Sequence, residues 1–363
     1  MFNPNSSNYE RTERVLADLT PDPRDFAGRI YPAEDVKRDL AQLEAFKHNP
    51  DYKSPSGRSR AKVLEKTFTD MVELGDWFRE ETAYGDDPDY QALITFPTSE
   101  IDDAFNHIDL IGMIKNTATD HRIVPFAIDL TYNTSDEKMA SKFAKRHNYG
   151  TTPNAPEGVS EFGTVRLVNY HGQMVPETRR MSLKHKLGLK IPGFATAKYY
   201  EDKNNPWTPM HEKGRINVMP RFVIGYSTAI SDVLAEGPPT EKYREEYGET
   251  AYQSKKASFK DAERRAKWCT LFECAEQAQD IQMMIETLTS QETVSMPQDE
   301  LEEAKFQIAA LNDYFGKALE IATAESKGDA EELAAIKYAK NDAVHAAIKR
   351  HSRETYIDNG RQL

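Results

Sequence analysis

The chain has 363 residues, of which 39% are hydrophobic and 29% are charged, and its formal net charge is −12. This composition is typical of a globular protein of about two or three domains, and the sequence contains no apolar run long enough to span a membrane. The acidic balance argues against a protein that coats nucleic acid non-specifically, because such binding needs many lysine and arginine contacts to phosphates. A nucleic-acid enzyme is not excluded, since a metal site requires acidic residues.

The N-terminal region, residues 1–57, is rich in Pro, Asn, Asp and Ser, and we interpret it as an extension. We expect one helix within 31–50 and a linker at 49–60, NPDYKSPSGRSR. The first residues, MFNPNSSNYERTER, lack the apolar core of a signal peptide. The chain has two cysteines, Cys269 and Cys274, whose spacing is not that of a zinc site, and we expect both on the buried side of a helix. These features predict a cytoplasmic protein.

An amphipathic helix is predicted over 60–82, RAKVLEKTFTDMVELGDWFREET, because its apolar residues recur at steps of three and four. Glu65 lies at the edge of this apolar stripe. The buried face of the helix therefore carries a carboxylate at its margin.

Two strands are predicted between His107 and Asn133, HIDLIGMIKNTATDHRIVPFAIDLTYN. Residue alternation places Asp109 on one face of the first strand, and Asp129 and Thr131 on one face of the second. The short polar link between the strands favours an antiparallel hairpin. A buried unpaired carboxylate costs several kcal/mol, so one aspartate in each of two neighbouring strands requires an explanation.

The rest of the predicted α/β core, residues 58–240, continues the alternation of helices and strands. We expect a helix at 135–150, an irregular insertion at about 151–219 with one strand candidate at 164–171, a strand at 220–227 and a helix at 228–237. The predicted fold class is therefore α/β (α+β), with a mixed sheet flanked by helices.

The C-terminal part, residues 256–353, has the pattern of three long helices and is predicted to form a helical domain, as a bundle or a clamp. Its apolar stripes exceed what one thin layer can cover, so they pack on each other, on the core or on a second subunit. We expect a homodimer formed through these helices.

Asp109 and Asp129 are the candidate functional residues. Two close carboxylates repel each other, and one of them acquires a raised pKa unless a cation lies between them. All-oxygen ligands suit Mg²⁺ or Mn²⁺. The alternative is a structural hydrogen-bond network. We interpret Asp102 and Asp103 as loop carboxylates rather than ligands.

The segments HIDLIGM and PFAIDLT resemble the core of the PD-(D/E)XK nuclease superfamily, which has the restriction-endonuclease-like fold, and the resemblance covers about 60–236. In that family a helix glutamate precedes a strand aspartate, and a second strand carries an acidic residue, one intervening residue and a lysine. The resemblance assigns the first aspartate to Asp109, the second acidic position to Asp129 and the helix glutamate to Glu65, with Glu73 as the second choice.

Thr131 occupies the position of the family's lysine, which is a departure from the pattern. Some members take the lysine from the next helix, and Lys138 is our first choice for that role, with Lys142 second. The resemblance implies hydrolysis of phosphodiester bonds in nucleic acid, DNA before RNA, with Mg²⁺ or Mn²⁺ held by Glu65, Asp109 and Asp129.

Two other functions stay open on the sequence. A protein that kept the fold and lost the lysine would be a catalytically inactive module for nucleic-acid binding or assembly. A structural protein would use its C-terminal helices for oligomerisation and its α/β part as a scaffold. Thr131 favours the inactive module, whereas the pair Asp109 and Asp129 favours the enzyme.

Overall fold

A five-stranded sheet forms the centre of the protein. The computed structural model describes residues 20–48, 55–74, 77–78, 93–116, 122–132, 136–144, 167–168, 174–175, 193–201, 213–290 and 298–358. In these residues the strand order is β1-β2-β3-β7-β6, beside a separate two-stranded pair, β4 and β5. The strands are β1 (Leu93–Pro97), β2 (Leu110–Asn116), β3 (Arg122–Thr131), β4 (Leu167–Val168), β5 (Met174–Val175), β6 (Phe194–Glu201) and β7 (Lys213–Gly225).

The sheet is mixed. β1 is antiparallel to β2, β2 is antiparallel to β3, β3 is parallel to β7, and β7 is antiparallel to β6. The expected hairpin of β2 and β3 is confirmed, with Leu110 opposite Ile128 and Ile114 opposite Val124. The parallel step from β3 to β7 includes helix α4 (Asp136–Ala144), because a parallel neighbour requires a crossover connection.

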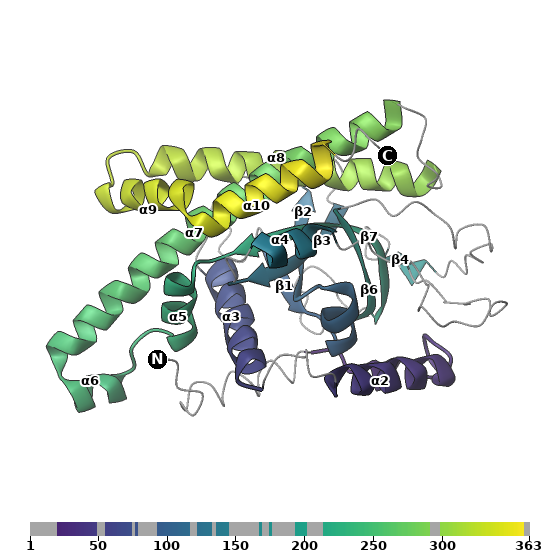
Figure 1. Cartoon of the computed structure of the whole chain (residues 1–363), viewed down its shortest axis with the longest axis horizontal. Coiled ribbons are helices and arrows are strands. Elements are labelled where there is room, and N and C mark those ends of the chain that lie inside the picture. The colour runs from purple at the N-terminus through teal and green to yellow at the C-terminus, as the bar shows by residue number, and fades with distance from the viewer. Residues whose placement is uncertain are drawn as a thin grey trace.

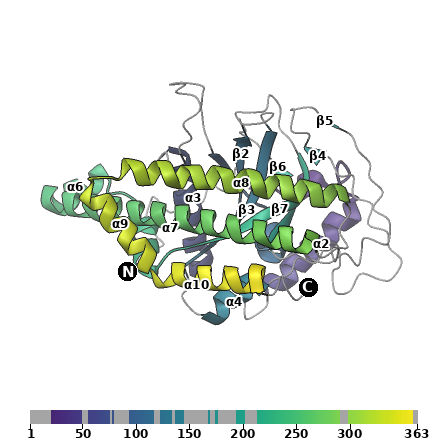
Figure 2. The same cartoon turned by 90° about the horizontal axis from the view of Figure 1, so that it is seen from above.

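Helices flank the mixed sheet, which confirms the predicted fold class. Helix α3 lies beside β1, and the long C-terminal helices α7, α8 and α10 lie across the sheet (Figure 1) and run side by side when seen from above (Figure 2). Besides α4, the described helical elements are η1 (Pro23–Phe26), α2 (Ala33–Lys47), α3 (Pro55–Leu74), η2 (Asp102–Asn106), α5 (Thr228–Glu236), α6 (Glu241–Tyr247), α7 (Glu249–Ser290), α8 (Gln298–Glu325), α9 (Ala330–Asn341), α10 (Ala343–Arg353) and η4 (Glu354–Asp358).

The C-terminal helices share one hydrophobic core with the sheet. The ring of Phe315 in α8 packs edge-on against Phe126 of β3 and Phe222 of β7, at centroid distances of 5.5 and 5.4 Å. The buried amide of Gln277 in α7 donates to the carbonyl of Val223 (2.8 Å) and accepts from its N–H (3.0 Å). The apolar stripes of these helices are therefore buried within one chain, both on each other and on the sheet.

Two sequence predictions are wrong at element boundaries, and a third is confirmed where the structure describes it. Helix α3 begins at Pro55, so the second half of the expected linker 49–60 is helical, and proline is favoured in a first helical turn. The expected irregular insertion 151–219 contains β6 and the first part of β7. Within the strand candidate 164–171, the described structure is the two-residue strand β4.

The third C-terminal helix is in fact two helices, α9 and α10. Asp342 ends the first and caps the second, since its Oδ1 accepts from the N–H groups of Val344 (2.8 Å) and His345 (3.3 Å). Helix α7 also begins at Glu249, ahead of the expected start at residue 256. Ser135 and Gly150, the expected cap and stop of the helix at 135–150, lie outside the described residues.

Cys269 and Cys274 are buried free thiols on α7, as predicted. Among the described residues, no helix combines the length and the apolar character needed to cross a bilayer.

Candidate active site

Asp109 and Asp129 lie next to the last paired residues at one end of the β2–β3 pair. Leu110 is paired with Ile128, and Asp109 directly precedes Leu110 while Asp129 directly follows Ile128. Asp109 is the residue just before β2 rather than within it, and its N–H donates to the carbonyl of Ile128 (2.9 Å). Its Oδ2 accepts from the N–H of Leu130 (2.6 Å), which ties the carboxylate to the β3 backbone.

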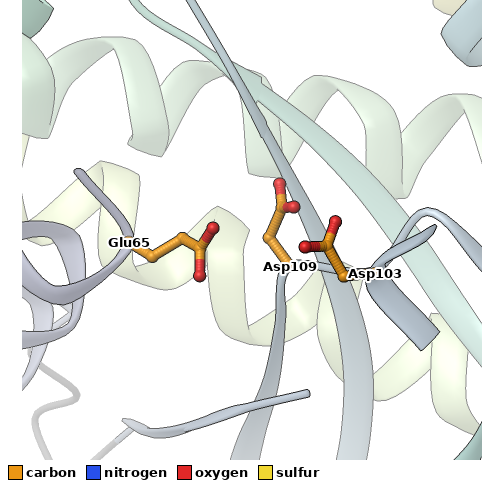
Figure 3. Close-up of side chains that lie close together, drawn as sticks. All are labelled: Glu65, Asp103 and Asp109. Atoms are coloured by element: carbon orange, nitrogen blue, oxygen red, sulfur yellow. The ribbon is translucent and has the colours of Figure 1, made fainter. Parts of the chain in front are cut away.

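Glu65 reaches the same place from helix α3. The apolar residues Leu64 and Phe68 bury one face of this helix, and Glu65 at the edge of that face is only 2% exposed. Carboxylate oxygens of Glu65, Asp103 and Asp109 all lie within 4.8 Å of one another. Figure 3 shows these three side chains directed toward a common space. The side chain of Glu73, the second choice for the helix glutamate, lies outside the described structure.

Asp103 was not expected as a ligand, and it reaches the cluster because Asp102 anchors its segment. The buried carboxylate of Asp102 accepts from the N–H groups of Lys198 (2.7 Å) and Tyr199 (2.9 Å) on β6. Burial raises the pKa of Asp102, although these hydrogen bonds oppose the rise. His107, at φ 53° in the left-handed region, then ends η2 and turns the chain toward β2.

One lysine partly balances the three carboxylates. The Nζ of Lys62, one turn before Glu65 on α3, lies 2.8 Å from Glu65 Oε2 and 3.4 Å from Asp103 Oδ2. Burial opposes the charge of Lys62, but Glu65 and Asp103 outweigh that effect and raise its pKa. Burial also raises the pKa of Asp109 well above its ordinary value, and the negative charges of Asp103 and Glu65 add to the rise.

Asp129 has the opposite environment. Its Oδ1 accepts from the ammonium of Lys142 on α4, and its Oδ2 lies 3.4 Å from Nη2 of Arg221 on β7. Burial would raise the pKa of Asp129, but the positive charges of Lys142 and Arg221 outweigh burial and lower it. The pKa values of the two aspartates are therefore shifted in opposite directions, that of Asp129 down and that of Asp109 up.

The lysine of α4 that contacts Asp129 in the described structure is Lys142, our second choice from the sequence. Its Nζ also donates to the carbonyl of Leu130 (3.3 Å). Lys138 lies in the first turn of α4, and its side chain is outside the described structure. Thr131, at the lysine position of the motif, is buried at the end of β3.

The carboxylate cluster fits Mg²⁺ or Mn²⁺. It offers only oxygen donors, and the raised pKa of Asp109 reflects negative charge that Lys62 does not fully balance. A divalent cation would relieve this repulsion and favour the ionised form of Asp109. Within the described part of the chain, Glu65, Asp103 and Asp109 form a group of carboxylates close enough to share one cation. Asp129 lies beside this group, and its charge acts on Asp109.

The chain matches no family model, and comparisons with curated proteins and with solved structures found no match. The resemblance to the PD-(D/E)XK superfamily therefore rests on the residues of this chain and on their arrangement.

Proposed function

We propose that this protein is a Mg²⁺- or Mn²⁺-dependent nuclease that hydrolyses phosphodiester bonds, with DNA preferred over RNA. One observation carries the proposal. A helix glutamate (Glu65), an aspartate at a strand start (Asp109), an acidic residue on the next strand (Asp129) and a lysine from the following helix (Lys142) meet at one end of a strand pair. This order of functional residues along the chain is the one that the resemblance implies.

Each residue has a defined task in this proposal. Glu65, Asp103 and Asp109 would hold a divalent ion, which would supply polarisation of the phosphate and a bound water of lowered pKa. Asp109 has to release its proton to act as a ligand, so metal affinity should rise with pH. Lys142 lies where its ammonium can stabilise negative charge on phosphate oxygens, and Asp129 holds that ammonium in place.

The direct test uses the full chain with plasmid DNA, single-stranded DNA and RNA, each with Mg²⁺, with Mn²⁺ and with a chelator. We expect metal-dependent cleavage by the wild type and none by Asp109→Asn. The melting temperature of the wild type should rise with Mn²⁺ concentration, and Asp109→Asn should lose that response. A wild type that cuts none of the three substrates with either metal would reject the nuclease proposal.

Two lysines on α4 can be compared as a matched pair. Removing a contact to a developing negative charge costs about 3 kcal/mol, or roughly a hundredfold in rate. We expect Lys142→Ala to slow cleavage by about that factor and Lys138→Ala to cut near the wild-type rate, with both variants folding normally. The reverse result would assign the catalytic role to Lys138. Wild-type rates in both variants would reject the hypothesis that a lysine of α4 replaces the motif lysine.

The second candidate function is a catalytically inactive module that binds nucleic acid or supports assembly. Thr131 in place of the motif lysine favours it, as does the existing ion pair between Lys142 and Asp129. Fluorescence anisotropy that shows DNA binding without cleavage in either metal would support this candidate. A cytoplasmic setting and a homodimer through the C-terminal helices belong to both proposals, and light scattering tests the dimer.

A further inference from the structure

Arg221 of β7 has no role in the residue pattern that suggested a nuclease, yet its guanidinium lies against that site. The residue is 5% exposed. Its Nη2 donates to the main-chain carbonyl of Lys142 and lies 3.4 Å from Oδ2 of Asp129. One buried donor group therefore contacts both the helix that carries the lysine and the carboxylate that holds that lysine.

These contacts form a closed ring across three elements. Asp129 of β3 accepts from the side chain of Lys142 through Oδ1 and is paired with Arg221 through Oδ2. The Arg221 guanidinium also donates to the main-chain carbonyl of Lys142. That carbonyl lies in the last turn of α4, where helix carbonyls have no partner within the helix. Arg221 thus fixes the end of α4 at the position that points Lys142 toward Asp129.

We propose that Arg221 is a positioning residue for the proposed reaction, which holds the end of α4 and the carboxylate of Asp129 so that Lys142 stays at the site. The inference rests on the proposed function and deepens it. When a substrate phosphate shares the ammonium of Lys142, Asp129 loses part of its countercharge. Arg221 then remains as the partner of Asp129, because a buried carboxylate that loses every partner is strongly destabilising.

The charged and titratable groups around Asp129 come from every neighbouring element. They are Lys142 on α4, Arg221 on β7, His107 and Asp109 before β2, and Tyr356 on η4. Lys142 and Arg221 contact the Asp129 carboxylate directly.

A double-mutant cycle on the full chain tests the inference, with the DNA substrate and metal that the wild type uses best. We expect Arg221→Gln to lower kcat about a hundredfold with little change in KM, because it removes the action of Lys142. In a Lys142→Ala background the same change should lower kcat less than about threefold. Arg221→Lys, which keeps a positive charge at this position, should restore part of the lost kcat. Arg265→Gln, which removes an ion pair on α7, is the matched control and should leave cleavage unchanged.

Mn²⁺ binding gives a readout that does not depend on cleavage. Calorimetry should show wild-type Mn²⁺ affinity in Arg221→Gln, because Glu65, Asp103 and Asp109 are untouched. If Arg221→Gln fails to fold, Arg221→Met, which keeps the length of the side chain without its charge, replaces it in the same cycle. If Arg221→Gln and Lys142→Ala each lower kcat about a hundredfold and their effects add in the double variant, the positioning role is overturned. The nuclease proposal would still stand. A wild type without metal-dependent cleavage would remove both.

Discussion

At the scale of single residues, Lys62 occupies the place that a metal ion would need. Its ammonium lies 2.8 Å from Glu65 and 3.4 Å from Asp103, so it competes with a divalent cation for the same oxygens. We predict that Lys62→Met strengthens Mn²⁺ binding about tenfold, which corresponds to roughly 1.4 kcal/mol. Calorimetry measures the affinity, and Lys66→Met, which removes the exposed pair with Asp70 one turn later, is the control. Weaker binding in Lys62→Met would mean that the lysine supports the metal site.

The residues of the site were predictable from the sequence to different degrees. Strand alternation and a short link were enough to place Asp109 near Asp129, since pairing in a hairpin is local. Asp103 was missed because its approach depends on Asp102 accepting hydrogen bonds from β6, which is distant in sequence. Arg221 was missed for the same reason, because its contacts form only after β7 has added to the sheet beside β3.

At the scale of elements, Gly225 controls how closely helix α10 approaches the end of β7. A Cβ atom at this position would lie 2.5 Å from Val344 Cγ1 and 2.6 Å from Ile348 Cδ1, both on α10. We predict that Gly225→Ala lowers the free energy of unfolding by about 1–3 kcal/mol, because the helix has to shift outward. Denaturant unfolding gives the measurement.

Gly316 on α8 is the matched control for this substitution. A Cβ atom there meets nothing within 4 Å, so Gly316→Ala should stabilise the protein by up to about 1 kcal/mol through helix propensity. Equal stability of Gly225→Ala and the wild type would show that α10 tolerates a wider spacing from the sheet.

Most elements could be predicted from local sequence patterns. The elements that could not be predicted in this way form through contacts with distant partners. α2, α5, α7 and α8 carry helical periodicity, and β2 and β3 carry dense apolar runs, so the sequence was sufficient for them. β6, FATAKYYE, was not predicted, because it lies in a region of mixed composition and is specified by pairing with β7. The break between α9 and α10 was missed because Asp342 was read as one more helical residue rather than as a cap.

At the scale of the whole molecule, the C-terminal helices help to hold the helix that carries Lys142. Phe143 on α4 packs against Tyr356 of η4 and His351 of α10, at ring-centroid distances of 5.9 and 6.4 Å. The helical region that the sequence suggested as a dimerisation element therefore also buttresses the candidate active site. Its apolar stripes are covered within one chain, so their burial does not itself require a second subunit.

A buried acid–base pair between α7 and α10 makes the stability of the molecule depend on pH. Glu273 on α7 accepts from the N–H of Gly225 (2.8 Å), and its Oε1 lies 3.6 Å from Nδ1 of His345 on α10. Burial raises the pKa of Glu273 to about 7, although His345 and the Gly225 N–H oppose the rise. Burial opposes the charge of His345, but Glu273 outweighs it and raises that pKa as well. The folded chain thus binds more protons here than the unfolded chain does.

Because both folded-state pKa values are raised, the stabilisation from this pair is complete below about pH 4.5 and declines as the pH rises toward and past 7. An amide cannot ionise, so Glu273→Gln should escape the decline. We predict that the variant and the wild type differ little in unfolding free energy near pH 5, and that the variant becomes the more stable of the two by up to about 3 kcal/mol at pH 8. Denaturant unfolding across this range measures the difference, with Glu286→Gln, at an exposed position on the same helix, as the control. A difference between Glu273→Gln and the wild type that stays constant from pH 5 to 8 would show that Glu273 is ionised throughout, with the charge of His345 fully balancing its burial.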